Sequence, residues 1–383
     1  MGKSKINKTM SQTDLIFNST LEYIEKKLKE NIISVKKMDK LYGSKSNNNI
    51  VITVGNFGGL NRYVLKFSTQ DDIEGEVKGT KFIEDYLPVP KTILSSKNKD
   101  NSWLLREYVP GVLMTDVTNH FEVTDKDGRL EEMEREKERL VVLGYEKKIG
   151  QIRLKEYLNL PANNLFYKRI NGARFKDFFL EGEIVKHLNK QIIVNGNKND
   201  LTLRQMFESI LAKYSTTSAK QISTYPSHGD AHQGNVIVSD KGNIYFFDNE
   251  YSGMMPSLMD LSKPYYNDLL GSLFFYFHPQ LLNYFELKSY KSTVNSLSFE
   301  IRLKRQLKTR VELAKIKLQQ RKKYISSDND FLSLNDYLFM CHTLTKDPNL
   351  YPDDIKKLFL AFCLIIYEFD PLNPESIYEY FVK

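Results

Sequence analysis

The segment from Ser227 to Val238 constrains the fold of this chain more than any other stretch. It reads Ser-His-Gly-Asp-Ala-His-Gln-Gly-Asn-Val-Ile-Val, so that four residues separate Asp230 from Asn235. A β-rich run, Asn243 to Phe247, then leads into a second carboxylate, Asp248. Phosphoryl transfer needs a carboxylate beside the acceptor hydroxyl and ligands for a metal ion that bridges the phosphates. The spacing therefore indicates a phosphoryl-transfer loop followed by a short hairpin.

The form of this loop resembles that of one known family. The pattern His-Gly-Asp-x-His-x-Gly-Asn, followed by a hairpin and an aspartate, resembles the aminoglycoside phosphotransferase and choline kinase family, which has a protein-kinase-like fold. That family often continues with a glutamate, a glycine, a proline and Asp-Leu, and the counterparts here are Glu250, Gly253, Pro256 and Asp260-Leu261. One departure is that the family's Leu-His pair, in the helix under the loop, has no counterpart here. One Asp and one Asn at this spacing arise readily by chance, whereas the longer set of matches favours the family.

The resemblance implies a role for each polar side chain of the loop. Asp230 would orient or deprotonate the acceptor hydroxyl, while Asn235 and Asp248 would hold Mg²⁺. His228 and His232 are expected to brace the loop through hydrogen bonds. The resemblance also implies a structural role for Asp260, which would cap or brace a helix.

A glycine-rich hairpin is predicted in the N-terminal part of the chain. Two β-branched runs, Ile50 to Val54 and Arg62 to Phe67, flank the sequence Gly-Asn-Phe-Gly-Gly at 55 to 59. Taken alone this segment indicates an ordinary turn. In the resembled family the hairpin binds the nucleotide, which makes Gly55, Gly58 and Gly59 candidate nucleotide-binding residues.

A lysine and a glutamate follow the hairpin at a suggestive spacing. Lys66 lies at the end of the second predicted strand, and Glu76 opens a helix-like run that extends to Leu87. In kinase-like folds a lysine in this place binds the α- and β-phosphates, and a helix glutamate holds its ammonium in position. Glu74 is the alternative partner. Without the downstream loop, Lys66 would be interpreted as an exposed strand lysine.

The segment from Ser102 to Gly111 is predicted to be a strand that ends in a Pro-Gly turn. It resembles the hinge between the two lobes of the family, where backbone groups near Glu107 and Val109 would hydrogen-bond adenine. The alternative is an ordinary strand and turn.

The remaining segments yield predictions of secondary structure. Residues 11 to 37 are expected to form one or two amphipathic helices, residues 129 to 139 an exposed helix with ion pairs between turns, and residues 214 to 224 a loop. After Asp248 the pattern indicates only helices, among them 332 to 345 and 353 to 369. Residues 300 to 323 carry ten Lys and Arg against two Glu. This segment is expected to be one solvated helix, with contact to an acidic acceptor, nucleic acid or an anionic membrane as alternatives. The aromatic and basic run 165 to 176 could line an acceptor pocket, although packing is favoured.

Length and composition exclude several classes of protein. A chain of 383 residues favours two lobes or domains, and 41% hydrophobic with 27% charged residues is typical of globular proteins. The longest apolar run, Leu358 to Tyr367, is half the length of a membrane span, and no secretory signal is expected at the start. The two cysteines, Cys341 and Cys363, are expected to be buried thiols in a reducing compartment, which indicates a cytoplasmic protein. The six histidines and two cysteines show no metal-ligand spacing, so no zinc site is expected.

These observations predict an α+β, bilobal, protein-kinase-like fold. A smaller lobe with an antiparallel sheet would span residues 1 to 108, and a larger, mainly helical lobe would span 109 to 383, with ATP and Mg²⁺ between them. The expected reaction moves the γ-phosphoryl group to a hydroxyl of a small molecule, such as a sugar, an amino alcohol or an aminoglycoside. Alternatives are a protein kinase-like enzyme, a pseudokinase that binds nucleotide without turnover, and a nucleic-acid-binding protein. No nucleic-acid motif accompanies the basic segment, so no nucleic acid partner is expected. The oligomeric state is left open.

Overall fold

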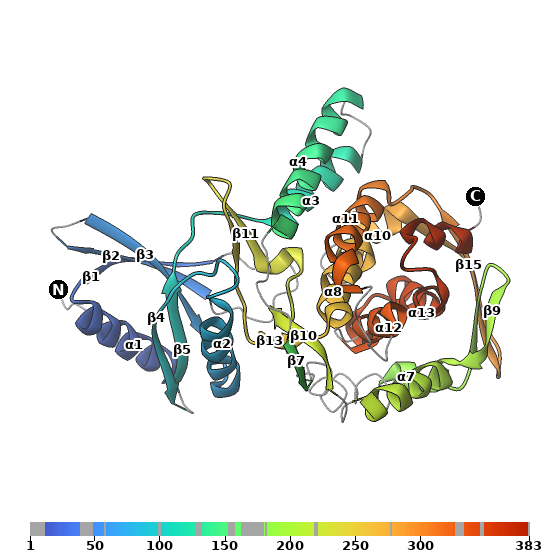
Figure 1. Ribbon diagram of the computed structural model, residues 1–383, viewed down its shortest axis with the longest axis horizontal. Helices are drawn as coiled ribbons and strands as arrows, with labels where there is room; N and C mark the ends of the chain where they lie inside the picture. The colour runs from blue at the N-terminus through green and yellow to red at the C-terminus, as the bar shows by residue number, and fades with distance from the viewer. Residues whose placement is uncertain are drawn as a thin grey trace, which may run out of the picture.

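The computed structural model combines a small sheet region with a larger region of mostly helices (Figure 1). The residues that it describes are 12–38, 49–56, 59–98, 101–126, 132–151, 158–161, 180, 182–217, 221–275, 278–325, 333–344 and 348–381.

A five-stranded antiparallel sheet forms the N-terminal region. Its elements are α1 (Gln12–Leu28), β1 (Asn31–Lys37), β2 (Asn49–Asn56), β3 (Gly59–Phe67), α2 (Gln70–Ile83), β4 (Thr92–Asn98) and β5 (Asn101–Glu107). The strands lie in the order β1-β2-β3-β5-β4. A buried cluster that includes Ile24 of α1 and Leu65 and Trp103 of the strands forms the core of this region. The prediction of helix through residue 37 is wrong beyond Leu28, because the β-branched run at 32 to 35 pairs with β2 as an edge strand.

Two helices, α3 (Met114–Lys126) and α4 (Glu132–Gln151), follow the short strand β6 (Gly111–Leu113) and project from the body of the molecule (Figure 1). The expected ion pairs on the charged segment include Arg139 with Glu136, three residues earlier. Arg139 also pairs with Glu312 of the C-terminal region and its side chain is only 13% exposed. This part of the charged segment is thus a packing surface, and the prediction of a fully solvated face is wrong at Arg139.

The C-terminal region holds the remaining elements. They are β7 (Leu158–Pro161), β8 (Gln191–Val194), β9 (Asn197–Thr202), α7 (Leu203–Thr217), β10 (Gln221–Ser227), β11 (Val236–Ser239), β12 (Ile244–Phe246), β13 (Gly253–Met255), α8 (Ser257–Tyr266), the π-helical turn η4 (Asn267–Gly271), α9 (Ser272–Phe275), α10 (His278–Tyr284), β14 (Phe285–Ser292), β15 (Ser296–Leu303), α11 (Lys308–Ile325), α12 (Leu334–Leu344) and α13 (Asp353–Glu368), with short 3₁₀ turns at Glu183–His187, Gln233–Asn235, Pro348–Leu350 and Pro374–Tyr380. Three small sheets accompany the helices, in the orders β13-β10-β7, β12-β11-β6 and β14-β15-β8-β9.

Two sequence predictions for this region are wrong. The chain after Asp248 is not wholly helical, because β13, β14 and β15 intervene. Residues 214 to 224 are not one loop either, since α7 extends to Thr217 and β10 begins at Gln221.

The basic segment 300 to 323 is not a single solvated helix. Its first residues belong to β15, where alternate side chains such as Phe299 and Ile301 are buried, and α11 begins only at Lys308. Arg310 and Lys317 of α11 are also buried. Lys317 lies between Glu146 of α4 and Asp268, 3.0 Å from the Asp268 carboxylate. Part of the positive charge of this segment is therefore neutralised inside the protein. The aromatic and basic run 165 to 176 lies outside the described residues.

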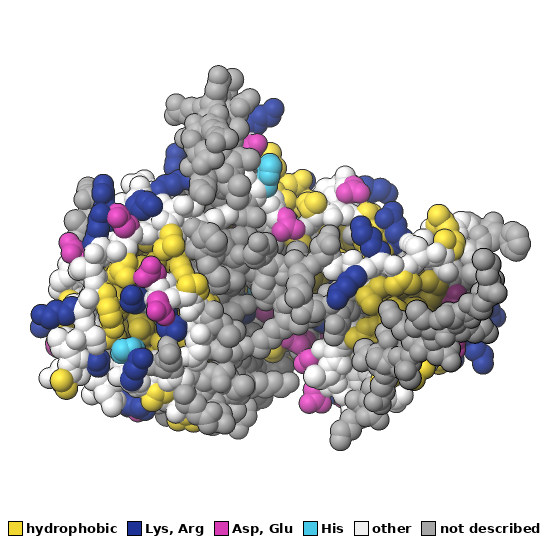
Figure 2. Space-filling view, turned by 180° about the vertical axis from the view of Figure 1, so that it is seen from behind, with side chains coloured by type: hydrophobic (Ala, Val, Ile, Leu, Met, Phe, Trp, Pro, Cys, Tyr) yellow, Lys and Arg dark blue, Asp and Glu magenta, His cyan; other side chains and the backbone are white. Residues whose placement is uncertain are grey.

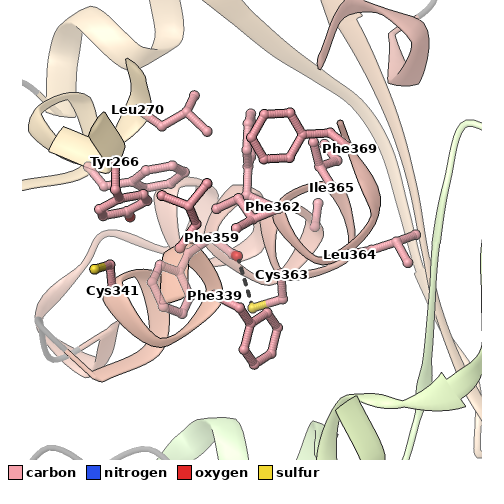
Figure 3. Close-up of a cluster of buried hydrophobic side chains, with 14 of the residues drawn as sticks. Tyr266, Leu270, Phe339, Cys341, Phe359, Phe362, Cys363, Leu364, Ile365 and Phe369 are labelled. Atoms are coloured by element: carbon pink, nitrogen blue, oxygen red, sulfur yellow. Dashed lines mark hydrogen bonds between the residues drawn. The ribbon is translucent and has the colours of Figure 1, made fainter. Parts of the chain in front are cut away.

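The two late helices, α12 and α13, are confirmed close to their predicted bounds and carry much of the larger core. Figure 3 shows this cluster. Phe339 belongs to α12, which also carries Cys341, while Phe359 and Phe362 belong to α13, and Tyr266 and Leu270 lie beside them. Both cysteines are free and buried, as predicted, and the Cys363 thiol donates to the Phe359 carbonyl at 3.5 Å. The α+β class, with a small antiparallel sheet region and a larger helical region, is likewise confirmed.

No helix in the described part of the chain is both long enough and apolar enough to cross a membrane.

Helix α2 joins the two regions by close contact with the segment after Asp248. A Cβ atom added at Gly79 would lie 1.8 Å from the Asn249 carbonyl oxygen, so only glycine permits this approach. The Asn249 amide donates to the Thr80 hydroxyl at 3.0 Å on the same face of the helix. The Phe246 N–H donates to the Pro88 carbonyl at 2.8 Å. These contacts fix α2, and with it Glu76, against the C-terminal region.

We predict that Gly79→Ala destabilises the protein by about 1–3 kcal/mol, because the added methyl group forces α2 away from Asn249. The matched control is Gly144→Ala in α4, where an added Cβ meets nothing within 4 Å. The control should be neutral or up to about 1 kcal/mol more stable, from helix propensity alone. Denaturant unfolding of the two variants measures the difference. Equal stability of both variants would show that α2 is not held by this contact.

Candidate active site

Lys66 is the centre of a buried ion-pair network between the two regions. Its ammonium lies 2.6 Å from Glu76 Oε2 and 2.7 Å from Asp248 Oδ1, and its side chain is 8% exposed. Burial alone would lower the pKa of Lys66, but Glu76 and Asp248 together raise it above its ordinary value. Lys66 is therefore held as a cation with a fixed position. The network joins a strand, a helix and the segment after β12, which are far apart in the sequence.

Glu76, and not Glu74, is the partner that the structure brings to Lys66. The second oxygen of Glu76 accepts from Arg106 Nη1 of β5 at 2.8 Å, so two cations hold one buried carboxylate. Glu74 instead pairs with Lys78 at 2.9 Å along the same helix, and Lys78 is 71% exposed. Arg106 also lies over the Phe247 ring, with its guanidinium 5.2 Å from the ring centroid, which is within the range of a cation–π contact.

Asp248 follows directly on the hairpin of β11 and β12, as its position in the sequence predicts. Its backbone has φ 63°, in the left-handed region that few residues other than glycine adopt. Burial would raise the pKa of Asp248, but the Lys66 ammonium, supported by Arg106, holds it below its ordinary value. A charged carboxylate is thus fixed in a strained turn where β12 ends, which is typical of functional positions.

The loop from His228 to Asn235 is held by hydrogen bonds between its own residues. The His228 ring contacts the Phe247 carbonyl at 3.0 Å and accepts from the Asp230 N–H at 3.2 Å. Burial lowers the pKa of His228, so the ring is held neutral and acts as a hydrogen-bonding brace. The His232 ring accepts from the Gly234 N–H at 3.0 Å. The prediction that both histidines brace the loop is confirmed.

Asn235 ties the loop to the hairpin. Its side-chain amide donates to the Asp230 carbonyl at 3.0 Å, and its own carbonyl accepts from the Phe247 N–H at 3.1 Å. With the amide nitrogen held in this way, the side-chain oxygen of Asn235 is the atom left to bind a cation. The geometry therefore connects Asn235 to both Asp230 and the residue before Asp248.

Asp230 lies in the middle of this loop, and its side chain is mostly buried, at 13% exposed. Lys263 of α8 places its ammonium 2.8 Å from Asp230 Oδ1, and His232 Nε2 lies 3.9 Å from the same oxygen. Gly229, the preceding residue, has φ 75°, and a Cβ atom there would lie 2.5 Å from the Tyr251 carbonyl. The glycine thus allows the close turn that presents Asp230.

Asp260 braces the strand that enters the loop. Its carboxylate accepts from the Ser227 hydroxyl and, at 3.1 Å, from the Tyr225 hydroxyl. Arg321 of α11 pairs with the same carboxylate at 2.6 Å. Asp260 therefore links β10, α8 and α11, in agreement with the structural role expected from the sequence.

The predicted nucleotide-binding backbone is described in part. Gly55 and Gly59 lie in the β2–β3 hairpin, where Asn56 pairs with Gly59, whereas Gly58 lies outside the described residues. At the expected hinge the Glu107 N–H already donates to the Lys91 carbonyl at 2.9 Å. The Val109 N–H takes part in none of the backbone hydrogen bonds found among the described residues. Of the two, Val109 is the residue whose N–H can serve a ligand.

The residues predicted to hold Mg²⁺ fit that ion by their chemistry. An aspartate and an asparagine oxygen are the hard ligands that Mg²⁺ takes, and protein sites for it commonly supply only one or two side chains. Among the described residues no group of three or more His, Cys, Asp and Glu side chains is placed to hold a metal ion. With one aspartate and one asparagine as side-chain ligands, phosphate and water oxygens would complete the coordination of the ion.

Sequence reasoning missed three basic residues of the site: Arg106, Lys263 and Arg321. They pair, in that order, with Glu76, Asp230 and Asp260, three carboxylates that the sequence analysis did identify. Lys263 offered one signal, since it is the only Lys or Arg between Lys241 and Lys288 and lies three residues after Asp260. The other two reach the site through tertiary contacts over 30 and 61 positions, which local pattern does not reveal.

Comparison with known proteins gives similar solved structures at low sequence identity. Choline kinase LicA from Streptococcus pneumoniae is 16% identical, with a TM-score of 0.39 over 86% of this chain and 96% of that chain. Aminoglycoside phosphotransferase APH(4)-Ia is 10% identical, with a TM-score of 0.48 over 92% and 98%. An ethanolamine kinase from Plasmodium vivax is 14% identical, with a TM-score of 0.40 over 86% and 81%.

No protein-family profile and no curated protein matches the sequence. The similar structures are kinases of the kind that the loop motif resembles. Sequence identity and TM-score are both low, so the function of this chain is argued from its own contacts.

We predict that Glu76→Gln lowers the free energy of unfolding by about 3 kcal/mol, since it leaves Arg106 buried without its carboxylate while Lys66 keeps only Asp248. Glu74→Gln, on the same helix but at the surface, should leave the thermal midpoint essentially unchanged. Thermal and denaturant unfolding of both variants provide the test. A Glu74 variant as unstable as the Glu76 variant would contradict the assignment of partners.

Glu250 should give the protein a measurable pH dependence. Burial, with the nearby Asp248 carboxylate, raises the pKa of Glu250 from 4.5 to about 7. Between these values the folded protein holds a proton that the unfolded chain has lost, so stability contributed by Glu250 falls as the pH rises to about 7. Glu250→Gln should remove this pH dependence. The free energy of unfolding of the variant, relative to that of the wild type, should therefore rise as the pH increases from 4.5 to about 7. Denaturant unfolding in buffer free of magnesium and nucleotide measures both curves, and parallel curves would contradict the shift.

Proposed function

We propose that this protein is an ATP- and Mg²⁺-dependent phosphotransferase that moves the γ-phosphoryl group of ATP to the hydroxyl of a small molecule. The observation that supports the proposal most strongly is the contact of Lys66 with both Glu76 and Asp248. It joins the lysine of the sheet region to the segment after β12, which Asn235 links in turn to Asp230. Fixed charges of this kind are what phosphoryl transfer requires, since catalysis of this reaction is mainly positioning and electrostatic stabilisation.

The nucleotide would lie between residues 1–108 and 109–383, which we propose as the two lobes. Lys66 would bind the α- and β-phosphates, with Glu76 and Arg106 fixing its position. The hairpin with Gly55, Gly58 and Gly59 would lie over the phosphates, because glycine lets backbone N–H groups approach closely. Adenine would contact the backbone between Glu107 and Val109, with the Val109 N–H as the donor.

Asn235 and Asp248 would hold the magnesium ion. When bound, Mg²⁺ neutralises charge on the β- and γ-phosphate oxygens and so favours departure of ADP. The chain contributes the fixed carboxylate of Asp248 and the oxygen of Asn235. Glu250 lies close enough to Asp248 to respond to its charge.

Asp230 would orient the acceptor hydroxyl. In the transfer, a bond forms between the acceptor oxygen and the γ-phosphorus while the bond from that phosphorus to the β–γ bridging oxygen breaks, and ADP leaves. The hydroxyl proton passes to the Asp230 carboxylate and from there to solvent. The His228 and Asn235 contacts hold the main chain of Asp230 in place.

The arrangement favours an enzyme over the alternatives. Lys66, Glu76, Asp230, Asn235 and Asp248 are all present and lie in one connected network, whereas a pseudokinase would typically lack one of them. A nucleic-acid grip on the basic segment is disfavoured because Arg310 and Lys317 are buried. On the face shown in Figure 2, the Lys and Arg side chains that the structure describes lie scattered among acidic and hydrophobic ones. The loop motif favours a small-molecule acceptor over a protein, and the two buried thiols suit a reducing, cytoplasmic environment.

The two central aspartates should behave differently when replaced. Asp248→Ala should weaken Mg²⁺-ATP binding and abolish transfer, because it removes a metal ligand and the partner of Lys66. Asp230→Asn should lower turnover by roughly 10²- to 10⁴-fold, the range typical of acid–base groups, and leave ATP affinity almost unchanged. Slow hydrolysis of ATP by water provides the readout, together with calorimetric titration of ATP.

The control is Asp240→Asn, which replaces an exposed aspartate of the same hairpin and should alter neither quantity. Full activity of Asp230→Asn, or a loss of ATP binding as large as that of Asp248→Ala, would contradict these roles.

A further inference from the structure

We propose that Lys263 is a positioning residue for the transfer step, one that fixes the Asp230 carboxylate and offsets its charge. The inference rests on the proposed function and adds a residue that the loop motif does not contain. Lys263 belongs to α8, which follows the loop by some 20 positions and packs beneath it. Its ammonium is 2.8 Å from Asp230 Oδ1.

The burial of Lys263 gives the first argument. All but one of the ten residues of α8 are buried, and Lys263 itself is 7% exposed. Lysine is almost never buried unless its charge is paired, because removing an ammonium from water is costly. A purely structural position in such a helix is filled as well or better by an apolar residue of similar volume. A lysine that points at the candidate catalytic carboxylate is therefore a candidate for a role in the reaction.

The way in which Asp230 is held gives the second argument. Its backbone is fixed by three bonds, from its N–H to His228, and to its carbonyl from Asn235 and from the His232 N–H at 2.8 Å. These bonds set the main chain but leave the side-chain torsions free. Lys263 contacts the carboxylate itself and so decides where its oxygens point. The ammonium at Oδ1 thus sets the orientation of the carboxylate that would meet the acceptor hydroxyl.

The position of α8 gives the third argument. Asp260, one turn before Lys263 on the same helix, binds Ser227 and Tyr225 in the strand that enters the loop. Arg321 holds Asp260 from α11. Helix α8 thus contacts the strand before the loop through Asp260 and the middle of the loop through Lys263. Displacement at either point would move Asp230 relative to the hairpin that carries Asp248.

Charge supplies the chemical reason for a cation here. The γ-phosphoryl group is anionic, and a bare carboxylate beside it would repel it. An ammonium 2.8 Å from that carboxylate reduces the repulsion. Because Lys263 is close to the proposed point of transfer, its positive charge also lies near the negative charge that the phosphoryl oxygens carry in the transition state.

The test uses the full chain with Mg²⁺-ATP and water as the acceptor. Lys263→Met keeps the length of the side chain and removes its charge, and it should lower the rate of ATP hydrolysis by about 10²-fold, the size expected of a misplaced catalytic group. The KM for ATP should change less than threefold, since Lys66 and Asp248 remain. Lys263→Arg, which restores the charge, should recover most of the rate. Lys213→Met, which also breaks a pair between a lysine and a buried aspartate, Asp336, away from the loop, should leave the rate unchanged.

A double variant keeps the test decisive if Lys263→Met unfolds. Asp230→Asn with Lys263→Met removes both charges, and it should hydrolyse ATP at the rate of Asp230→Asn alone, because a positioning residue acts through its partner. A further loss of tenfold or more in the double variant would overturn the inference, as would wild-type activity in Lys263→Met. A wild-type protein that neither binds nor hydrolyses Mg²⁺-ATP would overturn the proposed function, and this inference with it.

Discussion

The ion pair of Lys66 with Glu76 and Asp248 is the interaction on which the rest of the structure depends. It is the place where a strand of the sheet region, a helix and the segment after β12 meet through charged atoms less than 3 Å apart. Burying three charges in one place is costly unless each has a partner, and Arg106 supplies the fourth charge that balances the two carboxylates. The pairing thereby requires the two regions to close on one another in a single register.

The supporting contacts are consistent with this requirement. Gly79 lets α2 approach the Asn249 backbone, and the bond from Phe246 to Pro88 fixes the segment that follows the helix. Asn235 links the hairpin that precedes Asp248 to Asp230. Helix α8 also holds this loop, through Asp260 and Lys263. Charged groups that would repel one another in an open chain are therefore held within one site. Such preorganisation is the main contribution that a protein makes to phosphoryl transfer.

The sequence indicated which polar residues lie together in the candidate site better than it predicted the secondary structure around them. Asp230, Asn235 and Asp248 could be found because they belong to one short segment, and Lys66 with Glu76 because strand and helix signals preceded each. The basic partners could not be found, since Arg321 meets Asp260 only when α11 packs on α8. The strands β1, β14 and β15 were mistaken for helix because their apolar residues also fit a helical period over a short window. Arg310 and Lys317 were predicted to lie at the surface, although both are buried. The sequence alone does not show that Lys317 pairs with Glu146 and Asp268 inside the fold.

Isothermal titration calorimetry of the protein with ATP, in the presence and absence of Mg²⁺, tests the central claim most directly. The account predicts binding of one ATP per chain that tightens when Mg²⁺ is present and is lost when Lys66 is replaced by Met. At a hundredfold excess over Kd, such binding stabilises the fold by about 2.7 kcal/mol, so the thermal midpoint should rise in parallel. No Mg²⁺-dependent binding at millimolar ATP, or equal binding by the Lys66 variant, would contradict the claim that this network is a nucleotide site.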